Sequence, residues 1–120
     1  MKRLYALRGA VQCRNTVDDI CKQISLMYDE LLCANELEEK DIVSVIFSVT
    51  SDLTAINPCT ALRLSGRGEA LALFSSREPE TRNSLEMTVR ALVHCYLEEG
   101  SNARHVYKNG AEVLRPDRVC

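Results

Sequence analysis

The spacing of apolar residues changes along the first third of the chain. Residues 3–11 alternate between two faces, as in a β-strand, and one of these faces carries Leu4, Ala6, Arg8 and Ala10. Residues 17–32 instead place apolar side chains at helical spacing. Thr16, followed three residues later by Asp19, resembles a capping box at the start of that helix. The pattern predicts a strand followed by a helix that packs on a sheet.

The middle of the chain predicts two more strands and a short helix. A polar connection at 35–41 leads to IVSVIFSV, residues 42–49, which are β-branched and apolar on both faces, as in a central strand covered on both sides. Pro58 is suited to open a short helix that runs through Leu64 and ends at Gly66. Residues 70–74, ALALF, predict a short third strand.

The last third of the chain predicts a long helix and a hairpin. Residues 84–99, SLEMTVRALVHCYLEE, are apolar on almost every side, and we expect a helix that ends at Gly100. Residues 104–114 hold two short apolar runs around Asn109-Gly110, a pair that favours the type I′ turn of a hairpin. Pro116 would stop the second strand of that hairpin.

The predicted order of elements, β-α-β-α-β-α-β-β, defines the fold class. It indicates one domain over residues 1–120, of the α+β or mixed-sheet α/β type, with a mixed β-sheet covered by helices on one face. The face without helices then needs a partner, and another copy of the chain could supply it.

Composition narrows the range of functions. The net charge of −2, with no basic stripe, argues against a nucleic-acid binder. The start, MKRLYALRGAV, lacks the unbroken apolar core of a signal peptide, and no later stretch approaches the roughly 18 apolar residues of a membrane span. We therefore expect a soluble cytoplasmic protein. Six cysteines without a CxxC pair, and only two histidines, predict reduced thiols and no metal site.

The candidate chemistry rests on arginines. No Ser, Cys or Thr stands in a recognisable nucleophile motif, and residues 66–68, Gly-Arg-Gly, lack the GxxxxGK pattern of a phosphate loop. A guanidinium keeps its charge when desolvated and can bind two carboxylate oxygens at once. A small dianionic ligand is the simplest shared partner of the arginines that regular elements would hold, which are Arg8, Arg63, Arg90 and Arg115.

Each candidate also has an ordinary structural explanation. Arg90 would pair with Glu86, four residues earlier on the expected helix, and Arg8 would form an ordinary ion pair. Glu78 would place favourable charge near a helix N-terminus. Arg63 would lie on a solvated helix face, Tyr107 would pack across neighbouring strands, and Arg115 would sit at an exposed strand end.

Four stretches together resemble the monofunctional, trimeric AroH-class chorismate mutases. They are LRGAV near the start, VTSDLTAINP with Ala61 and Arg63 after it, Glu78 followed twelve residues later by Arg90, and RHVYKNGAEVLRPD at the end. These stretches cover the chain nearly end to end, and the last is quite specific. The resemblance implies a chorismate-mutase-like trimer that forms a pseudo α/β barrel, with active sites between subunits and no cofactor.

The implied reaction is the Claisen rearrangement of chorismate to prephenate, an isomerase step of aromatic amino-acid biosynthesis. On this resemblance, Arg90 would donate to the ether oxygen and a neighbouring carboxylate. Arg8 and Tyr107 would bind the side-chain carboxylate, and Glu78 would accept from the ring hydroxyl. The other implied substrate contacts are Arg63, Ser75, Arg115, Leu114, Phe74, Asn57 and Thr60.

Three positions depart from the family's pattern. Asn57 stands where an aromatic residue is frequent, Thr60 where a lysine is frequent, and Ser75 where a cysteine is common. Position 57 then lacks the apolar wall of the aromatic residue, and position 60 lacks the positive charge of the lysine. We therefore expect weaker substrate affinity with turnover less affected.

Two other functions stay open: a non-catalytic trimeric module that binds a small carboxylate, and a trimeric enzyme similar to the imine deaminases. The spacing of Glu78 and Arg90 and the RHVY to LRPD ending favour the mutase.

Overall fold

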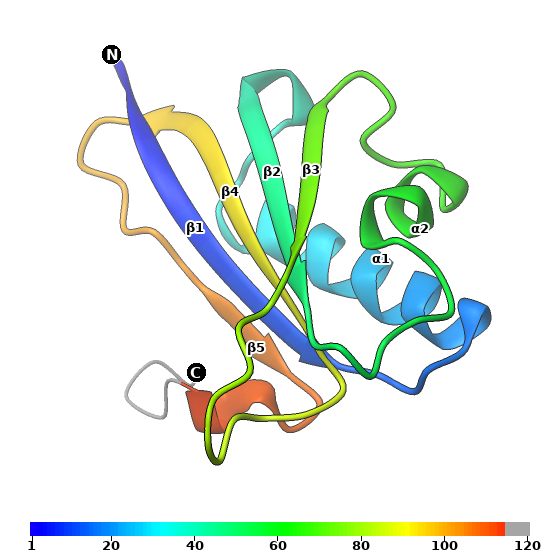
Figure 1. Cartoon of the computed structure of the whole chain (residues 1–120). Coiled ribbons are helices and arrows are strands. Elements are labelled where there is room, and N and C mark those ends of the chain that lie inside the picture. The colour runs from blue at the N-terminus through cyan, green and yellow to red at the C-terminus, as the bar shows by residue number, and fades with distance from the viewer. Residues whose placement is uncertain (115–120) are drawn as a thin grey trace.

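Five strands and two α-helices follow one another along residues 1–114 of the chain. The computed structural model describes residues 1–114 (Figure 1). The elements are β1 Lys2–Gln12, α1 Val17–Ala34, the 3-10 turn η1 Glu39–Asp41, β2 Ile42–Val49, α2 Pro58–Leu64, β3 Ala72–Arg77, β4 Thr88–Glu98, β5 Val106–Lys108 and the 3-10 turn η2 Ala111–Leu114. The predicted boundaries of β1 and α2 agree closely with this order, and the Thr16 hydroxyl caps α1 by accepting from the N–H of Asp19 at 3.1 Å.

All five strands belong to one sheet in the order β3-β2-β4-β1-β5. Strand β4 pairs antiparallel with both β1 and β2, whereas β3 pairs parallel with β2 and β5 pairs parallel with β1. The sheet is therefore mixed, as the sequence predicts for an α+β domain. The two longest strands, β1 and β4, lie side by side in it.

Both helices cover the same face of the sheet (Figure 1). Leu7, Val45 and Val93 from the strands pack with Ile24 and other side chains of α1 in one buried core. The strand β1 lies very close to α1: a methyl group added at residue 9, a glycine, would lie 3.0 Å from atoms of two α1 side chains. The opposite sheet face is open in this chain and exposes the apolar residues Leu4, Ile46, Phe74 and Tyr96.

The helix predicted over residues 84–99 is wrong, because this segment forms strand β4. Its burial alternates with a period of two: Val89, Val93 and Leu97 are buried against the helices, while Arg90 and Tyr96 lie on the open face. The open face of β4 also carries Leu92 and His94, so both phases of the strand look apolar in the sequence. Pairing with β1 and β2 on its two sides satisfies the backbone of the segment and overrides its helical appearance.

Three smaller expectations also need correction. Asn109 and Gly110 have the positive φ angles of 52° and 97° that a type I′ turn requires, but η2 follows instead of a second hairpin strand. The Glu112 carboxylate accepts from the N–H of Gly110 at 2.8 Å, and Ala111 is buried, which favours the helical turn. Strand β3 begins two residues later than predicted, and β2 is covered by helices on one face only.

Candidate active site

A hollow on the open face of the sheet gathers several of the predicted site residues. It encloses about 330 Å³, and its principal side chains are Arg8, Ile46, Ser48, Arg90, Leu92 and Tyr107. They come from four strands, β1, β2, β4 and β5. The hollow therefore depends on the long-range pairing of the sheet rather than on any one segment.

Strand register explains why these side chains meet. Ser48, Arg90, Ala10 and Tyr107 form one row across the sheet, because each is the register partner of the next. Ile46, Leu92 and Arg8 form the adjacent row, two residues away on β2, β4 and β1. Side chains two residues apart share a sheet face, and neighbouring strands lie about 4.8 Å apart. Both rows therefore point to the open face.

The anion that faces Arg90 within the chain is Glu78 and not Glu86. The Arg90 Nε lies 3.7 Å from Glu78 Oε1, and the side chains are 45% and 23% exposed. The same Oε1 accepts a hydrogen bond from the Ser48 hydroxyl at 2.5 Å. Glu86 uses its backbone carbonyl to accept from the side chains of Gln12 and Thr88, and no ion pair joins it to Arg90. The pairing expected on a helix is lost because the segment is a strand.

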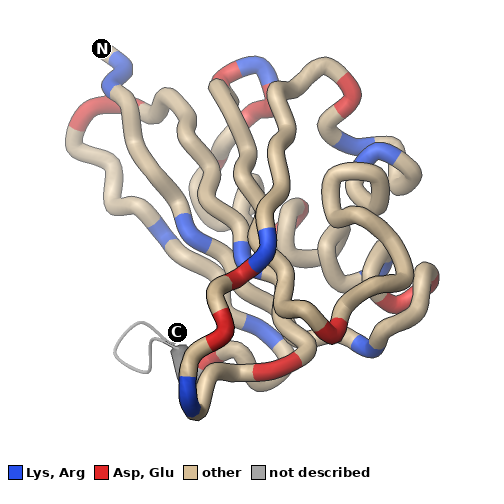
Figure 2. The backbone as a smooth tube through the Cα atoms, in the orientation of Figure 1, with Lys and Arg blue, Asp and Glu red and all other residues tan. Residues whose placement is uncertain are grey.

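Arg8 and Tyr107 complete the charged side of the hollow. The Arg8 backbone N–H donates to His105 Nδ1 at 2.9 Å, which ties the middle of β1 to the start of β5. Two arginines and a tyrosine thus line this hollow, so its charge suits a small dianion. Glu78 lines a separate hollow of about 260 Å³ and meets this one through its contacts with Arg90 and Ser48. Figure 2 shows the basic positions on neighbouring central strands and acidic positions after the end of β3.

The remaining predicted residues lie outside this hollow, along α2 and β3. Asn57 caps α2 by accepting from the N–H of Cys59 at 2.8 Å, and its amide donates to the Ser75 hydroxyl at 3.1 Å. Both residues line a second hollow of about 390 Å³. Thr60 and Arg63 are exposed on α2.

Phe74 is exposed on the open face of β3, and Leu114 is the last residue of η2. Arg115 lies outside the described residues. A single chain therefore gathers only part of the predicted site in one place.

Ser48 lies in the first row of the hollow and donates to Glu78, but it was not predicted from the sequence. A serine within an apolar strand carries no local signal, and only the register that sets it opposite Arg90 identifies it. Ile46 and Leu92 were missed for the same reason.

The described part of the chain holds no cluster of metal-ligating side chains. Within residues 1–114, no three His, Cys, Asp or Glu side chains gather closely enough to hold a metal ion. Burial raises the pKa of the Cys13 and Cys95 thiols to about 11, which suppresses their thiolate forms near neutral pH. Over the same residues, no helix has the length and apolar character needed to cross a bilayer.

Fold and site together define a class: a small α+β domain with helices on one sheet face and an arginine-lined hollow on the other. The chain belongs to the chorismate mutase type I family, whose model matches residues 4–118. It is 32% identical over 114 residues to chorismate mutase AroH of Thermus thermophilus, covering 92% of this chain and 93% of that protein. It is 26% identical over 116 residues to chorismate mutase AroH of Bacillus subtilis strain 168, covering 95% and 91% of the two chains.

A solved structure gives the same result for the fold. The chorismate mutase from Clostridium thermocellum, Cth-682, superimposes with a TM-score of 0.85 at 38% sequence identity, covering 91% of this chain and 98% of that chain. The five-stranded mixed sheet with two helices on one face is therefore the fold of that enzyme as well.

Proposed function

We propose that the protein is a chorismate mutase, an isomerase that rearranges chorismate to prephenate in the cytoplasmic biosynthesis of phenylalanine and tyrosine. The observation that carries this proposal is the convergence of Arg8, Arg90 and Tyr107 in one hollow, with Glu78 at its edge. Chorismate carries two carboxylates and a ring hydroxyl, which these groups complement in charge and in hydrogen bonding. Family membership supports the same substrate.

The chemistry needs no nucleophile or metal. In the Claisen rearrangement an ether C–O bond breaks while a C–C bond forms within the same molecule, and negative charge grows on the ether oxygen. Arg90 donates to this oxygen and stabilises the charge in the transition state. Arg8 and Tyr107 bind the side-chain carboxylate, and Glu78 accepts from the ring hydroxyl. Together these contacts hold the substrate in its compact, reactive conformer.

We propose further that the working form is a homotrimer with the active sites between subunits. The open sheet face exposes large apolar side chains such as Phe74 and Tyr96, which an isolated domain would leave in water. Arg63, Asn57, Thr60 and Ser75 lie outside the hollow of their own chain, so in this assembly they would line the site of a neighbouring chain. Arg63 and Arg115 would close its entrance electrostatically, and Leu114 would contact the substrate.

Turnover of chorismate tests the activity directly. The loss of its ultraviolet absorbance is followed for the parent, for Arg90→Ala, and for Arg67→Ala as a matched control that removes an arginine bound to Asp29 on the helix layer. Removing a charged transition-state donor costs about 3–4 kcal/mol, so kcat of Arg90→Ala should fall about 10²–10³-fold while Arg67→Ala stays within about two-fold. A folded parent that leaves chorismate unchanged contradicts the proposal, and binding without turnover would favour a carboxylate-binding module.

Sedimentation tests the assembly. A trimer at the protein concentration of the assay is expected. A stable monomer that turns over chorismate at full rate would contradict the shared sites.

A further inference from the structure

Within the described part of the chain, Ser48 is the one residue whose hydroxyl donates a hydrogen bond to the Glu78 carboxylate. It lies in β2, half-buried, directly opposite Arg90 of β4 in the strand register. Its Oγ donates to Glu78 Oε1 at 2.5 Å. The hydroxyl also lines the hollow itself. It is therefore close enough to the proposed reaction to influence it, although the sequence motifs that suggest the activity do not include it.

Glu78 needs an external anchor because of where it sits in the chain. It follows the last residue of β3, at the start of the loop that leads to β4. Its backbone N–H donates to the Val49 carbonyl at 2.8 Å, which fixes the main chain but leaves the side-chain torsions free. A glutamate side chain on a loop samples several rotamers in solution. The hydrogen bond from Ser48, the neighbour of Val49, supplies a second point of attachment to β2.

In the part of the chain that the structure describes, the internal contacts of Glu78 involve only one of its two carboxylate oxygens. Oε1 receives the Ser48 hydroxyl at 2.5 Å and faces Arg90 Nε at 3.7 Å. Within residues 1–114, no hydrogen bond is donated to Oε2. An acceptor held in this way can accept a hydrogen bond from a ligand hydroxyl without first releasing an internal partner.

We propose that Ser48 is a positioning residue for the reaction: its hydroxyl fixes Oε1 of Glu78, so that Oε2 is oriented toward the ring hydroxyl of the substrate and Arg90 stays directed into the hollow. This inference rests on the proposed function, because it assigns Glu78 the ring hydroxyl. Ser48 itself does not touch the substrate in this account. Its effect passes through Glu78, which distinguishes it from the arginines.

Loss of the hydroxyl should lower kcat rather than raise KM. The substrate would still bind through the arginines, so KM should change less than about two-fold, but fewer bound molecules would sit in the reactive geometry. One hydrogen bond to a charged group corresponds to about ten-fold in rate. We therefore expect Ser48→Ala to lower kcat about ten-fold, and Ser48→Thr, which keeps the hydroxyl, to recover most of it.

Ser44→Ala is the matched control. Ser44 lies on the same strand and the same face, is half-buried like Ser48, and uses its hydroxyl on His94 Nδ1 at 3.2 Å, outside the hollow. It should keep the parent kcat within about two-fold. Thermal melts of all variants should agree with the parent within a few degrees, so that a general loss of structure is excluded.

A double-mutant cycle with Glu78→Ala separates positioning from a structural role. If Ser48 acts through Glu78, Ser48→Ala has no further effect on kcat in the Glu78→Ala background. An undiminished ten-fold loss in that background, or equal effects of Ser48→Ala and Ser44→Ala, would overturn the inference while chorismate turnover by the parent leaves the proposed function intact. A parent that is inert would overturn both.

Discussion

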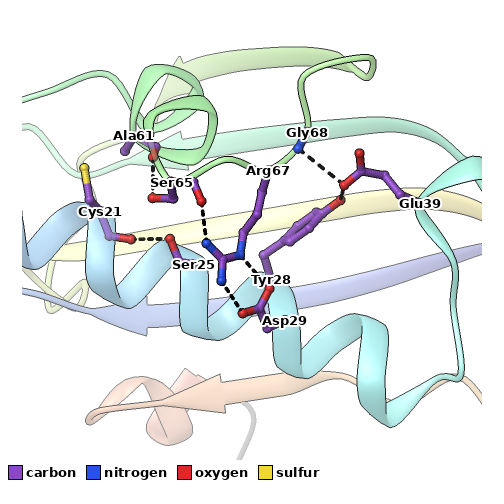
Figure 3. A network of polar contacts seen from close by, with 9 residues as sticks. All are labelled: Cys21, Ser25, Tyr28, Asp29, Glu39, Ala61, Ser65, Arg67 and Gly68. Atoms are coloured by element: carbon purple, nitrogen blue, oxygen red, sulfur yellow. Dashed lines mark hydrogen bonds and ion pairs between the residues drawn. The ribbon is translucent and has the colours of Figure 1, made fainter.

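The Tyr28 hydroxyl ties helix α1 to the segment that precedes β2. It donates to Glu39 Oε2 at 2.5 Å, and this same oxygen accepts from the N–H of Gly68 at 3.3 Å. Figure 3 shows the two contacts beside the bidentate pair between Arg67 and Asp29, which joins the α2–β3 loop to α1. Tyr28 is only 3% exposed, so Tyr28→Phe removes a buried donor and keeps the volume of the ring.

The expected cost follows from the partner of the hydroxyl. A hydrogen bond to a charged group contributes about 1.5–3 kcal/mol, and the value falls when the remaining partner can be rehydrated. Glu39 is half-buried, so water can reach its carboxylate in the variant. We therefore expect Tyr28→Phe to lower the free energy of unfolding by about 1–2 kcal/mol, which for a chain of this size lowers Tm by about 4–8 °C. Chorismate turnover should not change, because the contact lies on the helix side of the sheet.

The pH dependence of this cost has a definite sign. Burial, with a further contribution from Glu39, raises the pKa of Tyr28 above its ordinary value of 10.0. A group whose pKa is raised by folding contributes its full stabilisation below the pKa that it has in the unfolded chain. This stabilisation is lost as the pH rises from that pKa toward the pKa in the folded state. The difference between parent and Tyr28→Phe should be constant below pH 10 and then shrink by about 1.4 kcal/mol per pH unit. It should vanish about one unit above that.

Urea unfolding followed by circular dichroism at fixed protein concentration measures both effects. Tyr5→Phe is the control, since the Tyr5 hydroxyl accepts from the N–H of Gly100 at 3.0 Å and has only neutral backbone partners. We expect this control to cost less than about 1 kcal/mol. If Tyr28→Phe costs no more than Tyr5→Phe at neutral pH, the hydroxyl–carboxylate contact does not stabilise the fold. A difference that persists unchanged well above pH 10 would refute the assigned cause of the pKa shift.

Three further results are expected. Thr60→Lys and Asn57→Phe should each lower KM with little change in kcat. Asn57→Phe should also lower the free energy of unfolding by about 1 kcal/mol, because it removes the N-cap of α2. An unchanged KM in both variants would contradict the expectation that these two positions weaken substrate binding. The pKa of Asp19 is lowered below 3.8, mainly because its carboxylate accepts from the Arg14 backbone N–H at 2.6 Å. This carboxylate therefore stabilises the fold above pH 3.8, and the stabilisation is lost as the pH falls below that value. Urea unfolding should show Asp19→Asn less stable than the parent at neutral pH and equal to it in acid. Peptide mapping after brief alkylation at about pH 8 should find the exposed Cys33 modified, whereas the buried Cys95, whose pKa is raised to about 11, should react only after unfolding.

Local signals in the sequence predicted the elements that local chemistry decides. The Thr16 cap and the apolar spacing after it fixed the start of α1, and proline at the first helical position fixed α2. The prediction for β4 was wrong because its open face carries Leu92 and Tyr96, so that both faces of the strand look apolar in the sequence. Its identity as a strand depends on pairing with β1, whose residues lie about 85 positions earlier in the chain.

The site shows the same division between local and long-range information. Arg8, Arg90 and Tyr107 were predicted individually, and the resemblance to a family supplied their common role. Their convergence is a consequence of register across four strands, which no window of sequence contains. Ser48 had no local signal, so only the structure could reveal it.

The error over β4 matters for the chemistry, because strand geometry decides which carboxylate meets Arg90. On a helix, Glu86 would lie one turn away, and the two side chains would neutralise each other. On a strand, four residues span about 13 Å, so the partner must come from across the sheet. Glu78 reaches Arg90 from the far side of β2, over Ser48, whose small side chain lets the two charged groups approach. At 3.7 Å from Nε the contact is loose, and within residues 1–114 the terminal nitrogens of Arg90 make no hydrogen bond. A guanidinium held in this way lies close to a carboxylate while its two terminal nitrogens stay available to a ligand.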